Sequence, residues 1–288
     1  MGDQQSKSYI ITLDDLGKLD PFFSKKIGRI VGRMMIKGLG VDKLNKIHAK
    51  YLDLSKSDFT SAILSDPEIN VKYRVHGAEH LELMRDIEAF YTVSNHPFGG
   101  LDGVILIDLV SRIRPDFMVL VNQFLNHISG LKDVWIPIQP RVNKRDYVHD
   151  ASKNIYGLRK VRERITAGHP VGMFPAGGVP RYDRTTKRPK EQQWQITNTR
   201  ILMQSKIPIF PIAFEGKNTP LYFKIGELLN YQVASLRLPA EIFRKRGEEI
   251  QIYVGEPIMP EELLQYQELK TMRDFVQKRT MDLLPASK

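Results

Sequence analysis

Residues 89–113 read AFYTVSNHPFGGLDGVILIDLVSRI, and this stretch decides the fold. Residues 89–95 form a short apolar run that is typical of a buried strand, and residues 101–113 have the length and composition of a helix. Between them, Gly99 and Gly100 allow the chain to turn back sharply. A buried strand, a tight turn and a helix in this order are the repeating unit of α/β proteins.

The same alternation extends along the chain on both sides of this unit. Strands are expected at residues 71–77, 115–123, 133–140, 170–178, 208–216 and 250–258, and further helices at 154–168 and from Pro260 to Leu284. The sequence therefore predicts an α/β fold with a mostly parallel central sheet flanked by helices. In such sheets the chemistry lies in loops at the carboxyl ends of the strands. His96, Gly177 and Glu215 each follow a buried strand, so we expect them on one rim.

The composition indicates a packed protein without sulfur chemistry. A length of 288 residues with 42% hydrophobic content fits a single domain over 1–288, with a helical segment at 1–60, a core at 70–260 and a C-terminal helix at 260–288. The absence of cysteine excludes disulfides, thiolate metal sites and a cysteine nucleophile. The start of the chain lacks the pattern of a signal peptide, and no apolar run is long enough to span a bilayer, so we expect an intracellular protein.

A net charge of +10 predicts an anionic partner. Nucleic acid, an anionic lipid surface and a phosphorylated substrate all fit that charge, and so does a diffuse excess of lysine on a solvated surface. The charge alone does not choose among them.

Residues 21–40 form an amphipathic pattern, and we expect a helix there. Its apolar side is formed by Ile27, Ile30, Val31, Met34 and Met35, and its other side by Lys26, Arg29, Arg33 and Lys37. A helix with an apolar face and a purely cationic face suits an anionic membrane surface. The alternative is a helix packed on the core, and its glycines lower its helical propensity.

His96 and Asp102 are the candidate catalytic pair. A carboxylate beside one imidazole nitrogen fixes the tautomer and leaves the other nitrogen free to act as a base. Asp102 also stands where a helix N-cap is common, so spacing alone leaves both roles open. Ser94 is a candidate nucleophile, but the chain has no G-x-S-x-G elbow. Without a protein nucleophile, the base is expected to activate a hydroxyl of the substrate.

Several segments together resemble one enzyme family. They are NHPFGGLDG, FPAGG from Phe174, Arg181, IPIFPIAFEGKN, NTPLYFKIG and LPAEIFRKRGEEIQIYVGEPI. In this order they resemble the glycerolipid (1-acylglycerol-3-phosphate) acyltransferases, and among them a bacterial hemolysin-like subgroup that includes lyso-ornithine-lipid acyltransferases. The resemblance implies that His96 takes the proton of a lysolipid hydroxyl while Asp102 orients it. The oxygen then attacks the thioester of an acyl carrier protein or coenzyme A, with no cofactor, metal or acyl-enzyme.

The resemblance also implies a substrate-binding set. Its members are Asn95, Gly99, Gly100, Arg141, Phe174, Pro175, Gly177, Gly178, Arg181 and Glu215. Glycines after a strand present N–H groups to an anionic head group, and an arginine can bind it bidentately. The chain departs from the family twice. Five residues separate His96 from Asp102 where four are common, and the second motif has Ala176 and Gly178 where relatives have glutamate. Another acid such as Glu215 is the expected substitute.

The expected setting is membrane lipid biosynthesis at the cytoplasmic face of the inner membrane. Lysophosphatidate, a glycerophospholipid and an amino-acid lysolipid remain open as acceptors. A thioesterase or lipase that uses the same pair with water or Ser94 is the alternative enzyme. A nucleic-acid-binding protein is disfavoured because Tyr182 is the only aromatic residue in the basic tract 181–190. A pore-forming toxin is disfavoured because no segment spans a membrane.

Overall fold

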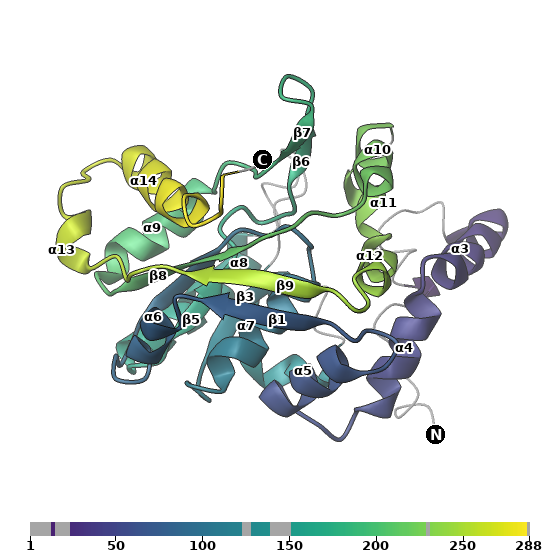
Figure 1. Ribbon diagram of the computed structural model, residues 1–288, viewed down its shortest axis with the longest axis horizontal. Coiled ribbons are helices and arrows are strands. Elements are labelled where there is room, and N and C mark those ends of the chain that lie inside the picture. The colour runs from purple at the N-terminus through teal and green to yellow at the C-terminus, as the bar shows by residue number, and fades with distance from the viewer. Residues whose placement is uncertain (1–12, 15–23, 123–127, 139–150, 229–230, 287–288) are drawn as a thin grey trace.

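A computed structural model describes residues 13–14, 24–122, 128–138, 151–228 and 231–286 (Figure 1). Its centre is a seven-stranded sheet with the order β1-β9-β8-β2-β5-β3-β4. The strands are β1 (Lys72–His76), β2 (Tyr91–Ser94), β3 (Met118–Asn122), β4 (Trp135–Ile138), β5 (Val171–Met173), β8 (Ile209–Phe214) and β9 (Glu249–Val254). Each overlaps a segment in which a strand was expected, and the α/β prediction is confirmed.

Five adjacent strands, from β8 to β4, run parallel to one another. In the middle of this group Val93 of β2 lies opposite Pro211 of β8 and Met173 of β5. Strand β9 reverses the direction and pairs antiparallel with β8, and β1 runs parallel to β9 at the edge. Along β1, exposed residues alternate with half-buried ones, as is typical of an edge strand. The sheet is therefore mostly parallel, with one reversal.

Helices cover both faces of the sheet. On one face α5 (Lys56–Ser65) and α7 (Leu101–Ser111) enclose a core that includes Phe59, Ile105 and Phe214. On the other face α8 (Ala151–Thr166), α9 (Ile196–Ser205) and α14 (Leu269–Met281) enclose a second core around Trp194. The remaining helices are α3 (Lys26–Gly38), α4 (Val41–Lys50), α6 (Ala78–Leu83), η3 (Ser129–Val134), α10 (Pro220–Leu228), α11 (Tyr231–Ser235), α12 (Leu238–Arg244) and α13 (Pro260–Leu263). Helix α5 begins within the predicted N-terminal segment 1–60 but packs into the core.

The C-terminal region differs from its prediction. A single helix from Pro260 to Leu284 was expected, and the structure has α13 and α14 with a break between them. The break allows Tyr266 to stack on Phe275 with their ring centroids 4.7 Å apart. In one continuous helix, nine residues would separate the two positions by about 13.5 Å along the axis. Aromatic packing therefore explains the interruption.

The basic tract 181–190 forms an antiparallel hairpin of two short strands, β6 (Arg181–Asp183) and β7 (Arg188–Lys190). Arg181 lies opposite Lys190 in this hairpin, which projects from the sheet in Figure 1. The chain that leaves β7 returns toward the central strands.

Helix α3 forms where the amphipathic pattern predicted it, but its apolar side does not enter the core. The side chains of Ile27, Ile30 and Met34 are 72%, 54% and 69% exposed, whereas Gly28 and Gly32 are buried. The side chains of Val31 and Met35 lie outside the described set. In Figure 1, α3 projects at one end of the molecule beyond α4. No helix in the described ranges has the length and apolarity needed to cross a membrane.

Candidate active site

Three adjacent parallel strands bring the predicted site segments to one rim. Strand β2 lies between β8 and β5, and all three run in the same direction. His96 follows β2, the Phe174–Gly178 turn follows β5, and Glu215 follows β8. Parallel strands end at the same edge of a sheet, so the prediction that these segments share a rim is confirmed.

His96 and Asp102 face each other across the turn. Nδ1 of His96 lies 3.1 Å from Oδ1 of Asp102, whose side chain is fully buried, while the imidazole is 18% exposed. The distance is that of a hydrogen bond, but the ring nitrogen is not aligned as a partner. Catalytic pairs are often misaligned without substrate and tighten when it binds. Nε2, the other ring nitrogen of His96, is then the one left to accept a proton.

Asp102 also holds the turn itself. Oδ2 accepts hydrogen bonds from the backbone N–H groups of Phe98 at 2.9 Å and Gly99 at 3.3 Å, and Oδ1 accepts one from Gly103 at 3.0 Å. Gly99 has a φ of +82°, and a Cβ there would lie 2.6 Å from Cγ1 of Val179. Asp102 therefore holds the turn together and faces the imidazole, but it is not the N-cap of α7: that position is Gly100, and Asp102 lies in the first turn of the helix.

The pKa of His96 is set by opposing effects. Burial favours the neutral imidazole and lowers the pKa, but the negative charges of Asp102 and Glu191 outweigh it, so the pKa is raised above its ordinary value. A raised pKa means that the neutral, base-competent form gains population as the pH rises through that pKa. The acids thus stabilise the protonated form that a general base reaches during catalysis.

Phe174 covers His96, and the turn after it is fixed against α9. The two ring centroids are 4.2 Å apart with an interplanar angle of 31°. The backbone carbonyl of Pro175 accepts a hydrogen bond from Nδ2 of Asn198 at 2.9 Å. Gly177 has a φ of +69°, and a Cβ there would lie 2.1 Å from Nε2 of Gln195. The left-handed backbone at 177 therefore favours glycine there.

One of the backbone N–H groups that were expected to bind an anionic head group is already used within the turn. The N–H of Gly177 donates to the carbonyl of Phe174 at 2.9 Å, so it is not directed to a ligand. At Gly178 a Cβ would lie 3.1 Å from Nε2 of Gln192, which donates to the carbonyl of Val179. The two glycines thus serve close packing of the turn, and a head-group role for them stays a prediction.

Arg181 lies at the base of the hairpin. It is exposed, and its guanidinium lies 5.3 Å from the centre of the Tyr231 ring. Tyr231 is fixed in turn by the N–H of Tyr182, which donates to its hydroxyl at 2.8 Å. No ion pair of Arg181 occurs within the described part of the chain. A positioned and unpaired guanidinium is suited to bind an anion bidentately.

The other predicted substrate-binding residues have varied environments. Asn95 is buried, and its side chain exchanges two hydrogen bonds with the backbone of Phe214, which joins the ends of β2 and β8. Glu215 is exposed and accepts a hydrogen bond from the hydroxyl of Tyr253 at 2.9 Å. Gly100 is the N-cap of α7. Arg141 lies outside the described residues.

One acidic residue of this site was not expected. Glu191 comes directly after β7, and its carboxylate interacts electrostatically with His96 and Asp102. Burial raises its pKa to about 7, although the charge of His96 opposes the shift. In the sequence, Glu191 merely ends a basic tract, and no motif marks it. The hairpin fold is what brings it to the imidazole.

Ser94 does not form a catalytic pair with His96. Its side chain is fully buried at the end of β2, and its Oγ has no hydrogen-bond partner within the described ranges. A serine nucleophile requires a base within hydrogen-bond reach. The site therefore favours a hydroxyl supplied by a substrate over Ser94.

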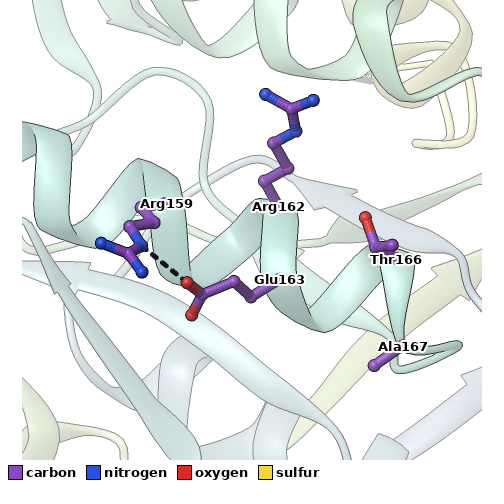
Figure 2. Close-up of a pocket in the computed structure, with 5 residues that line it drawn as sticks. All are labelled: Arg159, Arg162, Glu163, Thr166 and Ala167. Atoms are coloured by element: carbon purple, nitrogen blue, oxygen red, sulfur yellow. Dashed lines mark hydrogen bonds and ion pairs between the residues drawn. The ribbon is translucent and has the colours of Figure 1, made fainter.

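A separate surface hollow lies on α8, away from the rim residues. It is lined by Arg159, Arg162, Glu163, Thr166 and Ala167 (Figure 2). Nε of Arg159 donates to Oε1 of Glu163 at 2.7 Å. This i, i+4 ion pair is exposed on the helix, and none of the predicted catalytic groups lines the hollow.

Comparison with known proteins gives consistent matches. A family model described as Acyltransferase matches residues 16–287. A lyso-glycine lipid O-acyltransferase of Bacteroides thetaiotaomicron is 28% identical over 242 residues, which cover 81% of this chain and 82% of that protein. A lyso-glycine lipid O-acyltransferase of Phocaeicola vulgatus is 27% identical over 173 residues, 58% of either chain. The crystal structure of the 1-acyl-sn-glycerophosphate acyltransferase PlsC from Thermotoga maritima matches with a TM-score of 0.46 and 14% identity, over 88% of this chain and 95% of that one.

Proposed function

The chain belongs to the acyltransferase family, and from this premise we propose that it transfers a fatty acyl group from a thioester donor to the free hydroxyl of a lysolipid. The donor is an acyl carrier protein or coenzyme A thioester. The observation that supports this most is the His96–Asp102 pair on the rim, 3.1 Å apart, with no paired protein nucleophile in the described site. A base without a nucleophile needs a hydroxyl from a substrate.

The proposed mechanism uses His96 as the general base. Nδ1 faces Asp102, so Nε2 takes the proton as the acceptor oxygen attacks the thioester carbonyl carbon. The tetrahedral intermediate then expels the thiolate, and the imidazolium returns the proton to that sulfur. Asp102 stabilises the imidazolium while its backbone hydrogen bonds keep the turn in place. The acyl group ends on the acceptor oxygen and the proton on the sulfur of the leaving thiol, and no acyl-enzyme forms.

The acceptor is proposed from the relatives and from Arg181. Both curated relatives are named lyso-glycine lipid O-acyltransferases, and we propose an acceptor of the same class here. Arg181 is exposed on β6 and supplies a cation for an anionic head group. The basic hairpin around it, with Arg188 and Lys190, adds to the positive surface.

We also propose that the enzyme works at the cytoplasmic face of the inner membrane as a peripheral protein. The exposed apolar stripe of Ile27, Ile30 and Met34 on α3 supports this placement, because no core cluster of the described residues includes these side chains. Lys26, Arg33 and Lys37 are exposed on the same helix. An apolar stripe beside cations is what an interfacial helix presents to anionic lipid.

The direct test is acyl transfer by the purified protein. Labelled acyl chains on acyl carrier protein or on coenzyme A are offered with lyso-glycine lipid, with lysophosphatidate or with no acceptor. We expect label in the acylated lipid, with lyso-glycine lipid as the better acceptor. Release of free fatty acid at the same rate with and without acceptor would instead identify a thioesterase.

Asp102→Asn should lower kcat/KM by about 10² to 10⁴, because the amide cannot stabilise the imidazolium. It should also lower the melting temperature. The amide has one oxygen where the carboxylate has two, and a buried backbone N–H left without an acceptor costs about 1–3 kcal/mol. Steady-state kinetics and thermal unfolding measure the two effects. Asp58→Asn, an exposed change in the first turn of α5, is the control and should alter neither. Wild-type kinetics in Asp102→Asn would refute the assigned role.

A further inference from the structure

Glu191 is a buried acid that the proposed mechanism does not use. It lies in the segment between β7 and α9, directly after Lys190. Both of its carboxylate oxygens are buried, and neither has a hydrogen-bond partner of full geometry within the described ranges, although the backbone N–H of His96 and the side chain of Trp194 are close enough to act on the carboxylate. A buried carboxylate without hydrogen bonds is costly unless a positive charge lies nearby. The charged groups that face Glu191 therefore determine whether its carboxylate is stabilised.

The charged groups that face Glu191 are those of the catalytic pair. His96, from the loop after β2, attracts it, and Asp102, from α7, repels it. In the opposite direction, the acids that act on His96 are Asp102 and Glu191. Three elements of the fold thus place two carboxylates around one imidazole. When the imidazole is protonated, the cluster carries one positive and two negative charges.

The two acids differ in how they are held. Asp102 accepts three backbone hydrogen bonds from the turn, which fix its position and stabilise its charge. Glu191 has no comparable set of aligned donors within the described ranges: the charge of the imidazolium favours its carboxylate form most, and the backbone N–H of His96 and the side chain of Trp194 add to this. Asp102 is consequently tied to the architecture of the turn, whereas Glu191 responds to the state of His96.

We propose that Glu191 is a positioning residue that acts through His96: its carboxylate stabilises the imidazolium and makes the imidazole a stronger base. This inference rests on the proposed role of His96 as general base. As the acceptor hydroxyl loses its proton, positive charge develops on His96, and a buried carboxylate stabilises that charge more than a solvated one does. Glu191 and His96 then titrate as a coupled pair rather than as two independent groups.

The sign of the expected effect follows from this coupling. Removing the charge of Glu191 removes one stabiliser of the imidazolium, so the pKa of His96 should fall. The neutral base then persists to lower pH, and the acid limb of the kcat/KM profile moves to lower pH. The plateau rate should fall as well, since a weaker base accepts the proton less readily.

The decisive experiment is an NMR titration of the His96 ring in the full chain without substrate. The resonance is assigned by its absence in His96→Asn. In Glu191→Gln the midpoint should move to lower pH by about half a unit or more. Glu191→Asp keeps the charge and should stay closer to wild type than Glu191→Gln. Glu227→Gln removes an acid of α10 that pairs with Arg184 at 2.9 Å, and should leave the midpoint in place.

A second uncharged variant guards against a folding artefact. Glu191→Met removes the charge without burying an amide and should shift the midpoint in the same direction as Glu191→Gln. An unchanged midpoint in either variant, with a wild-type melting temperature, overturns the proposal. Because the titration needs no turnover, its result is separate from whether the chain acylates a lysolipid. The kcat/KM profile is then a second readout.

Discussion

His96→Ala should reduce kcat/KM for acyl transfer by about 10² to 10⁴, the usual cost of removing a positioned general base. The fold should survive the change. Asp102 keeps its backbone hydrogen bonds to Phe98, Gly99 and Gly103, so the turn does not depend on the imidazole. Vesicle binding should also survive, because the apolar stripe of α3 belongs to a different part of the chain. Steady-state kinetics, thermal unfolding and vesicle co-sedimentation measure the three properties.

His76→Ala is the matched control for this variant. His76 is an exposed histidine on β1 that stacks on Tyr253 with ring centroids 4.6 Å apart. Its removal changes one imidazole far along the sheet from β2, so activity should stay near that of the wild type. More than a tenth of wild-type turnover in His96→Ala would show that His96 is not the base.

Replacing the four cations of α3 with glutamine should release the protein from anionic vesicles. The four are Lys26, Arg29, Arg33 and Lys37. Each cation near an anionic surface contributes about 1 kcal/mol, so the four together give about 4 kcal/mol, or nearly a thousandfold in partitioning. Arg29 pairs with Asp14 at 2.9 Å, so its share is the smallest. Acylation of a bilayer lysolipid should slow, while a water-soluble short-chain acceptor should be used almost as before.

A control variant with the same loss of charge separates local from global electrostatics. It replaces Arg159, Arg162, Lys270 and Lys278, two exposed cations each from α8 and α14, with glutamine. This control should bind vesicles more tightly than the α3 variant, although both have the same net charge. The melting temperature of the α3 variant should stay near wild type, since these cations do not pack in the core. Unchanged sedimentation of the α3 variant would remove the membrane role of this helix.

Local patterns predicted much of the fold because most strands of the central sheet are short apolar runs, and the edge strand β1 alternates exposed with half-buried residues. The turn at Gly99 and Gly100 and the helix after it could also be predicted from the sequence, and so could the shared rim of His96, Gly177 and Glu215. The break between α13 and α14 was not predictable, because it depends on a contact between Tyr266 and Phe275 in three dimensions. Helical periodicity alone continues through such a break.

In the site, too, contacts between residues close in sequence could be predicted, whereas contacts between distant segments could not. His96 and Asp102 share a turn, so their spacing in sequence already limits their distance. Glu191 comes close to His96 because β6 and β7 pair as a hairpin. The basic residues of the tract 181–190 form no pattern that predicts this pairing. For Asn95, the sequence indicated proximity to the site but not its hydrogen bonds to Phe214, which belong to the junction of two strands.

The edge strand β1 has a consequence for how the chain is made. Its sheet neighbour is β9, and the ion pair between Arg74 and Glu249 that joins them spans 175 residues of sequence. During synthesis, β1 leaves the ribosome long before its partner exists, and such long-range pairing is slow to form. Helix α3 emerges earlier still, with its apolar stripe already complete. If α3 binds lipid as proposed, a nascent chain carries this helix through most of translation before the sheet can close, and membrane binding would then precede the end of folding.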